Sequence, residues 1–118
     1  MNDIDIPILK KTYDLYKTFH EYRKIVPKQD RFTIYERSED TMLEILENLL
    51  EAAHLDQSRK KEFLETASVK LNTLRFLIRM LKDVKSIDMK KYIILEGIMD
   101  EIGRMLGGWI RSAPHSGR

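Results

Sequence analysis

Residues 69–82 read Val-Lys-Leu-Asn-Thr-Leu-Arg-Phe-Leu-Ile-Arg-Met-Leu-Lys, and their pattern predicts the fold of the chain. Apolar side chains recur every three or four positions, as on one face of an α-helix. This core stripe comprises Leu71, Leu74, Leu77, Ile78 and Leu81. About a third of a turn away lies a second apolar stripe, made of Val69, Phe76 and Met80. A helix of a monomeric bundle needs only one stripe, so the second predicts self-association; the alternative is that it widens the core.

Three other segments have the same helical period, and together they predict helices over about residues 6–25, 31–55, 59–85 and 89–110. The loops between them are short, so consecutive helices must run antiparallel. We therefore expect an all-α, up-down-up-down four-helix bundle over residues 1–111. Residues 112–118 contain Pro, Ser and Gly and are expected to form a disordered tail.

Capping residues support these boundaries. Asp5 is suited to cap the first helix, whose first turn contains Pro7, and the proline at position 27 is expected to end it. For the other three helices the expected caps are Asp30, then Asp56 or Ser58, then Ser86 or Asp88.

Length and composition restrict the class of protein. With 118 residues the chain is expected to be one domain, and with no cysteine it has neither disulfides nor thiolate metal sites. No signal peptide or membrane-spanning stretch is evident, so we expect a cytoplasmic protein. Residues 31–55 contain 2 basic and 6 acidic side chains, whereas residues 56–86 contain 8 basic and 4 acidic ones. This asymmetry favours attraction between neighbouring helices, or a basic surface for an anionic partner.

No motif predicts catalysis, a metal or a cofactor. Glu51 and His54 match the Glu-x-x-His spacing of di-iron bundles, but that site needs the motif twice. The spacing is absent at His20, and His115 lies in the tail. A surface histidine near a helix C-terminus is therefore the preferred interpretation of His54. We expect a protein that binds partners and is not an enzyme, with no small-molecule substrate.

Glu39 projects onto the apolar face of the second helix, between Met42 and Leu46. A buried carboxylate needs a cationic partner. Arg75 or Arg79 from the neighbouring helix is the expected one, and a structural ion pair is favoured over a catalytic role.

The densest signature is Leu-Arg-Phe-Leu-Ile-Arg at residues 74–79, followed by Asp-Glu-Ile-Gly-Arg-Met-Leu-Gly-Gly-Trp-Ile-Arg at residues 100–111. Arg75 and Arg79 lie one turn apart and so share a face, as do Gly103 and Gly107, which permit close approach of another helix. Trp109 is suited to anchor the end of its helix. This pattern resembles the Avd family, the accessory variability determinants of diversity-generating retroelements, and the related proteins named for intervening sequences in 23S ribosomal RNA genes.

The resemblance covers residues 13–110 and implies a four-helix bundle that assembles into a homopentameric barrel. It implies binding to the retroelement's reverse transcriptase and to nucleic acid, in support of mutagenic copying of a template RNA into cDNA, without catalysis. The arginines that match the family's basic surface are Arg75, Arg79 and Arg104, and Lys82 is added because it shares their face. The expected oligomer interface comprises Val69, Phe76, Met80, Gly103, Gly107 and Trp109.

Two further expectations concern the partners. Contact with RNA or DNA is expected to be electrostatic, because no base-reading motif is present. No helix pairs a lysine-rich face with a Trp/Phe-rich one, so no membrane partner is expected. The alternative function is that of an intervening-sequence-type bundle that binds nucleic acid or protein outside a retroelement.

Overall fold

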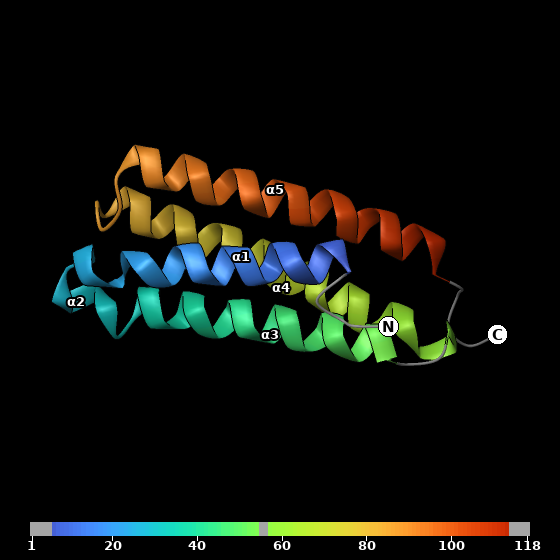
Figure 1. The fold of residues 1–118 in the computed structure, drawn as a ribbon. Coiled ribbons are helices and arrows are strands. Elements are labelled where there is room, and N and C mark those ends of the chain that lie inside the picture. The colour runs from blue at the N-terminus through green and yellow to red at the C-terminus, as the bar shows by residue number, and fades with distance from the viewer. Residues whose placement is uncertain (1–5, 55–56, 114–118) are drawn as a thin grey trace.

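The structure is a computed structural model that describes residues 6–54 and 57–113, and four long helices lie side by side in it (Figure 1). In order, the elements are α1 (Pro7–Glu21), the 3-10 helix η2 (Tyr22–Ile25), α2 (Lys28–Arg31), α3 (Ile34–His54), α4 (Gln57–Asp83) and α5 (Met89–Ser112). Helices α1 and α4 each contact both α3 and α5. The four therefore close into a bundle of 48 × 26 × 21 Å, and the predicted four-helix bundle is confirmed.

Each long helix turns its apolar face into one shared core. From α4 the core receives Leu71, Leu74, Ile78 and Leu81, as the core stripe predicts, and Leu64 and Ala67 continue it toward the helix start. Leu77, the fifth residue of the predicted stripe, is only half-buried. Phe19 of α1 and Tyr35 of α3 stack in the same core with ring centroids 4.2 Å apart. Burial of these apolar faces is the main favourable term that holds the helices together.

The connection from α1 to α3 differs from the prediction in its details. Helix α1 ends at Glu21 and tightens into η2, because Val26 precedes a proline and adopts extended backbone. A separate single turn, α2, then precedes α3, which begins at Ile34 instead of near residue 31.

Asp30 was expected to cap the second long helix, and this prediction is wrong. Asp30 lies inside α2, and its carboxylate accepts a hydrogen bond from the Ser86 hydroxyl in the turn between α4 and α5. Two turns that are far apart in sequence are thereby tied together at one end of the bundle. Pairwise contacts of this kind depend on the tertiary arrangement and leave no periodic signal.

The turn between α4 and α5 is closed by backbone hydrogen bonds. The Ser86 N–H donates to the Leu81 carbonyl, and the Lys85 N–H donates to that of Lys82, the pattern of a Schellman C-cap. Lys85 has φ 66°, the left-handed conformation that this cap requires. Asp88 then caps α5 by accepting the Lys91 N–H, and this bond lowers the pKa of Asp88. The alternative in which Asp88 caps α5 is confirmed.

Some expectations fall outside the described residues, namely the cap at Asp5, the cap at Asp56, His115 and tail residues 114–118. Ser58 lies within α4 and is not its N-cap. Helix α5 continues to Ser112, the first residue of the expected tail. Among the described residues, none of the helices combines the length and the apolar character that crossing a membrane requires.

Candidate binding surface on helices α4 and α5

The second apolar stripe of α4 points away from the core. Val69 is 65% exposed, Phe76 69% and Met80 43%. These three side chains, called the α4 stripe below, therefore do not widen the core. Exposed large apolar side chains in a row mark a surface suited to a partner.

Arg75 is held against helix α5. Its Nη1 donates to Asp100 Oδ1 at 2.6 Å and its Nη2 to the Met99 carbonyl at 3.3 Å, and the side chain is 34% exposed. A Cβ on Gly103 would come within 2.9 Å of the same Nη2. The missing side chain at Gly103 thus makes room for the guanidinium group between the two helices.

Arg79 and Lys82 differ in how freely they reach solvent. Arg79 is 64% exposed, and its Nε lies 3.8 Å from Asp83 Oδ2. Lys82 is 24% exposed and leans toward α5, with its Nζ 4.7 Å from the centroid of the Tyr92 ring. Of the two, Arg79 is the cation available to a ligand.

A shallow pocket lies between α4 and α5. It is lined by Arg75, Phe76, Arg79, Tyr92 and Glu96. The Tyr92 hydroxyl donates to Glu96 Oε2 at 2.7 Å, and this hydrogen bond raises the pKa of Tyr92. The pocket therefore combines two arginines and an exposed phenylalanine with one carboxylate, a mixture suited to an anionic or amphipathic ligand.

The profile of the bAvd-like family matches residues 6–113, which is nearly the whole chain and includes this surface.

The chain belongs to the bAvd-like family.

A solved structure shares the fold of this bAvd-like chain. It is the crystal structure of a protein of unknown function from the S23 ribosomal protein family of Bacteroides thetaiotaomicron. The two superpose with a TM-score of 0.79 at 18% identity, over 89% of this chain and 99% of the other. At that identity the likeness concerns the fold alone. No curated protein matches the chain.

Arg104 lies apart from the pocket. It is 73% exposed and reaches Glu101 Oε1 at 3.9 Å. Glu101 also forms an ion pair with Lys11 Nζ at 2.9 Å, and this pair joins α5 to α1. Among the described residues, no ion pair connects Arg104 with Arg75 or Arg79.

The other residues expected at an oligomer interface make contacts inside the subunit. Gly103 faces Arg75, and a Cβ on Gly107 would lie 3.4 Å from Arg111 Nη1. Trp109 is half-buried and packs against the core. Their participation in an interface stays a prediction.

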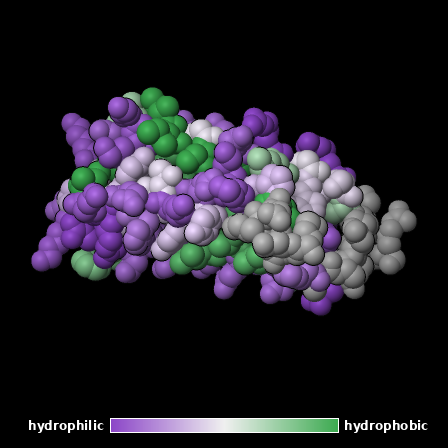
Figure 2. Space-filling view, in the orientation of Figure 1, coloured by the Kyte–Doolittle hydropathy of each residue, from purple (hydrophilic) through white to green (hydrophobic). Residues whose placement is uncertain are grey.

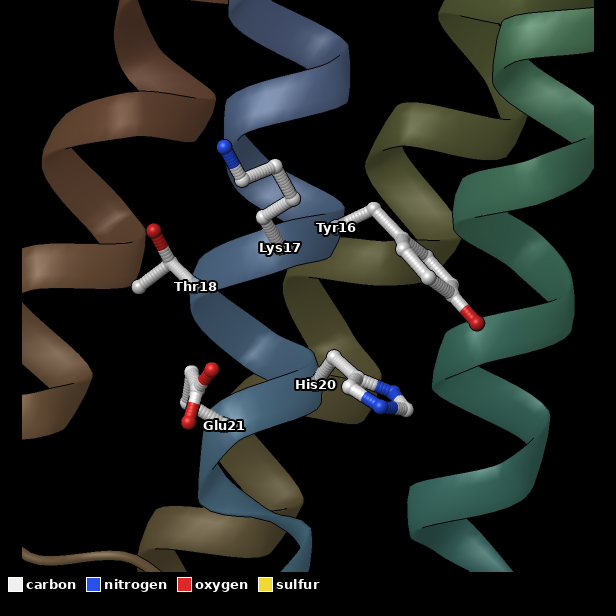
Figure 3. A pocket seen from close by; sticks show the side chains of 5 residues that line it. All are labelled: Tyr16, Lys17, Thr18, His20 and Glu21. Atoms are coloured by element: carbon white, nitrogen blue, oxygen red, sulfur yellow. The ribbon is translucent and has the colours of Figure 1, made fainter.

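The predicted pairing of Glu39 with Arg75 or Arg79 is wrong. Glu39 is 13% exposed, and its partners are His20 Nδ1 at 3.5 Å and Arg23 Nη1 at 3.7 Å. The reason is geometric, because the side of α3 that carries Glu39 faces α1 and not α4. Figure 3 shows His20 pointing toward α3, together with Tyr16, whose ring centroid is 5.9 Å from that of His20.

Glu51 and His54 are both exposed at the end of α3. In the described ranges, no three His, Cys, Asp or Glu side chains are arranged to hold a metal ion. The geometry of Glu51 and His54 therefore gives a metal site no support beyond the Glu-x-x-His spacing itself.

Sequence reasoning missed the exposed apolar side chains of α5. Met89, Ile93 and Ile94 are all exposed. Figure 2 shows a hydrophobic patch over the first half of this helix. The signal was the run Tyr-Ile-Ile-Leu at residues 92–95, because four consecutive apolar residues cannot all face the core of one bundle.

Proposed function

We propose that this chain is a non-catalytic accessory protein of a diversity-generating retroelement. It associates with itself and binds the reverse transcriptase and the template RNA or its cDNA. One observation carries the proposal, namely that a bAvd-like chain exposes an apolar stripe beside arginines on the face of α4 and α5. An apolar centre with a charged rim is the usual composition of a protein-binding surface.

The four cations expected to bind nucleic acid are not equivalent in this proposal. Arg75 is paired with Asp100 of α5, and Lys82 contacts Asp83 of α4 and the Tyr92 ring of α5, whereas Arg79 and Arg104 are exposed. Arg104, which lies apart from the α4 stripe, is therefore assigned to phosphate contacts, and Arg79 to the charged rim of the α4 stripe. Arg75 is assigned to positioning of α4 against α5. Affinity for nucleic acid should fall steeply with salt, because each neutralised phosphate releases counterions.

The first test is the native mass of the purified chain by light scattering. A mass near five times the 14.0 kDa chain supports the homopentamer. The chain is then co-expressed with the reverse transcriptase of the same retroelement and recovered through a tag on the polymerase. Recovery of the wild type, and loss of recovery with Arg79→Glu, supports the proposal. Failure to recover the wild type contradicts it.

The second test separates nucleic-acid binding from polymerase binding. A labelled RNA oligonucleotide is titrated with the wild type, Arg79→Gln and Arg104→Gln at low and at moderate salt. We expect Arg104→Gln to weaken binding and to reduce the salt slope by about one, and Arg79→Gln to leave the RNA affinity close to that of the wild type. Lys17→Gln, on an exposed side of α1, serves as a matched control. Affinity that does not change with salt would exclude a phosphate-directed mode.

A second candidate function is considered because the chain shares its fold with a protein of unknown function from the S23 ribosomal protein family. In this alternative the chain binds nucleic acid or protein outside a retroelement. The adjoining genes distinguish the two, since a retroelement chain requires a reverse-transcriptase gene beside its own.

A further inference from the structure

A second exposed apolar surface lies on α3 and has the opposite charge. A shallow groove there is lined by Leu43, Leu46 and Leu50 together with Asp40, Glu44 and Glu47. We call this set the α3 strip. Figure 2 shows hydrophobic surface over α3 along the lower edge of the molecule. The leucines are spaced by three and four residues, so they line up along one side of the helix.

The fold uses part of the α3 strip, since Leu46 and Leu50 are partly buried against the core. Leu43 is 42% exposed, and only Glu44 has an ion pair among the described residues, at 3.1 Å from Lys70 Nζ. Asp40 and Glu47 make none within the described residues. A leucine row flanked along one side by unpaired acids is suited to an amphipathic helix that carries basic residues.

The chain itself presents such a helix. Residues 69–82 of α4 contain four basic side chains and no acidic one, whereas residues 36–51 of α3 contain six acidic and one basic. The α4 stripe supplies the apolar row, with Phe76 69% exposed, and Arg79 supplies an exposed cation beside it. The two surfaces thus match in both apolar character and charge.

The two surfaces cannot meet inside one subunit, because both point outward from the same bundle. We propose that the α3 strip of one copy receives the α4 stripe of a second copy. This inference rests on the self-association in the proposed function and specifies its geometry. The contact joins two different surfaces, so a pair of copies still offers one free α3 strip and one free α4 stripe, and further copies can add. Such a heterologous contact builds a ring if the rotation closes.

Packing of α4 on α4 is the main competing arrangement. A two-fold contact centred on Phe76 would bring Arg75 and Arg79 of both copies together, and like charges at a contact are repulsive. The α3 strip offers Asp40 and Glu47 instead. Opposite charges across the contact also raise the association rate, so assembly should slow and weaken as salt rises.

The experiment compares two surface variants of the full chain by light scattering. Leu43→Ser damages the α3 strip, and Phe76→Ser damages the α4 stripe. Ile94→Ser is the matched control, because Ile94 of α5 is 43% exposed, close to the 42% of Leu43, and belongs to neither surface. Helix content by circular dichroism verifies that each variant is folded.

We expect both Leu43→Ser and Phe76→Ser to lose assembly, while Ile94→Ser retains it. Mixed in equal amounts, the two deficient variants should form a one-to-one dimer, since each supplies the intact surface that the other lacks. If Leu43→Ser still assembles while Phe76→Ser does not, the α3 strip is overturned as the receiving surface. Self-association itself remains supported in that case. Loss of assembly in all three variants also overturns the inference. A monomeric wild type contradicts self-association itself, and polymerase recovery then tests the rest of the proposed function.

Discussion

Gly103 of α5 lies against the guanidinium group of Arg75 of α4, so close that a Cβ would come within 2.9 Å of Nη2. The same guanidinium donates to Asp100 and to the Met99 carbonyl. The glycine in the middle of α5 thus permits a cross-helix contact that any larger residue would displace.

A pair of alanine substitutions measures this contact. Gly97 of α5 has nothing within 4 Å of the position of a Cβ, so Gly97→Ala should stabilise the protein by about 0.5–1 kcal/mol through helix propensity. Gly103→Ala gains the same propensity but displaces Arg75, so its net effect should be near zero or destabilising. Urea denaturation of both variants gives the difference. An equal gain from the two substitutions would show that Arg75 relaxes without cost.

Lys85→Gly should stabilise the turn between α4 and α5. Lys85 occupies the left-handed region with φ 66°, where a Cβ is unfavourable and glycine is the preferred residue. The expected gain is about 0.5–1 kcal/mol in the free energy of unfolding. Lys85→Ala removes the charge but keeps the Cβ, so a gain in that variant as well would assign the effect to charge instead of conformation.

Tyr35→Phe tests the one hydrogen bond that the buried ring makes. The Tyr35 hydroxyl donates to the Phe19 carbonyl at 2.5 Å, and the residue is fully buried. Phenylalanine keeps the ring stacking and removes the donor, so the protein should lose about 1 kcal/mol of stability at neutral pH. Chemical denaturation gives the value, and no change would mean that the bond contributes nothing net.

The same tyrosine predicts a loss of stability in alkali. Burial, and then the charge of Glu39, raises the pKa of Tyr35 above its ordinary value. The folded state therefore keeps this proton above about pH 10, whereas the unfolded state releases it. The free energy of unfolding should accordingly fall as the pH rises above about 10. In Tyr35→Phe the fall should be shallower, and an identical slope would contradict this origin.

Glu39→Ala should destabilise the fold by about 1–2 kcal/mol, because it leaves Arg23 and His20 without their carboxylate. Both partners lie beyond 3.4 Å and remain partly solvated, which keeps the effect below that of a fully buried pair. A double-mutant cycle identifies the partner. Coupling should appear with Arg23→Ala and be absent with Arg75→Ala. Coupling to Arg75 would contradict the contact seen between α3 and η2.

The sequence alone determined the helices and their inward faces. Leu71, Leu74, Ile78 and Leu81 are buried as their spacing predicts, because a 3.6-residue period translates directly into one face of a helix. The same rule placed the α4 stripe apart from the core stripe, whereas only the exposure of Phe76 in the structure excluded the alternative of a wider core. The cap at Asp88 was also readable, because a cap depends on residues within one turn of it.

The tertiary structure alone decided which side of each helix meets which neighbour. Glu39 could pair with a cation of α1, η2 or α4 until the rotation of α3 in the bundle was known, and it faces α1 and η2. Asp30 has the residue type and position of a cap, but its carboxylate accepts a hydrogen bond from Ser86, 56 residues away. Gly103 accommodates Arg75 from another helix. Periodicity specifies a face relative to its own helix axis, whereas these contacts depend on how two axes are placed and rotated, which only the packing of the whole core determines.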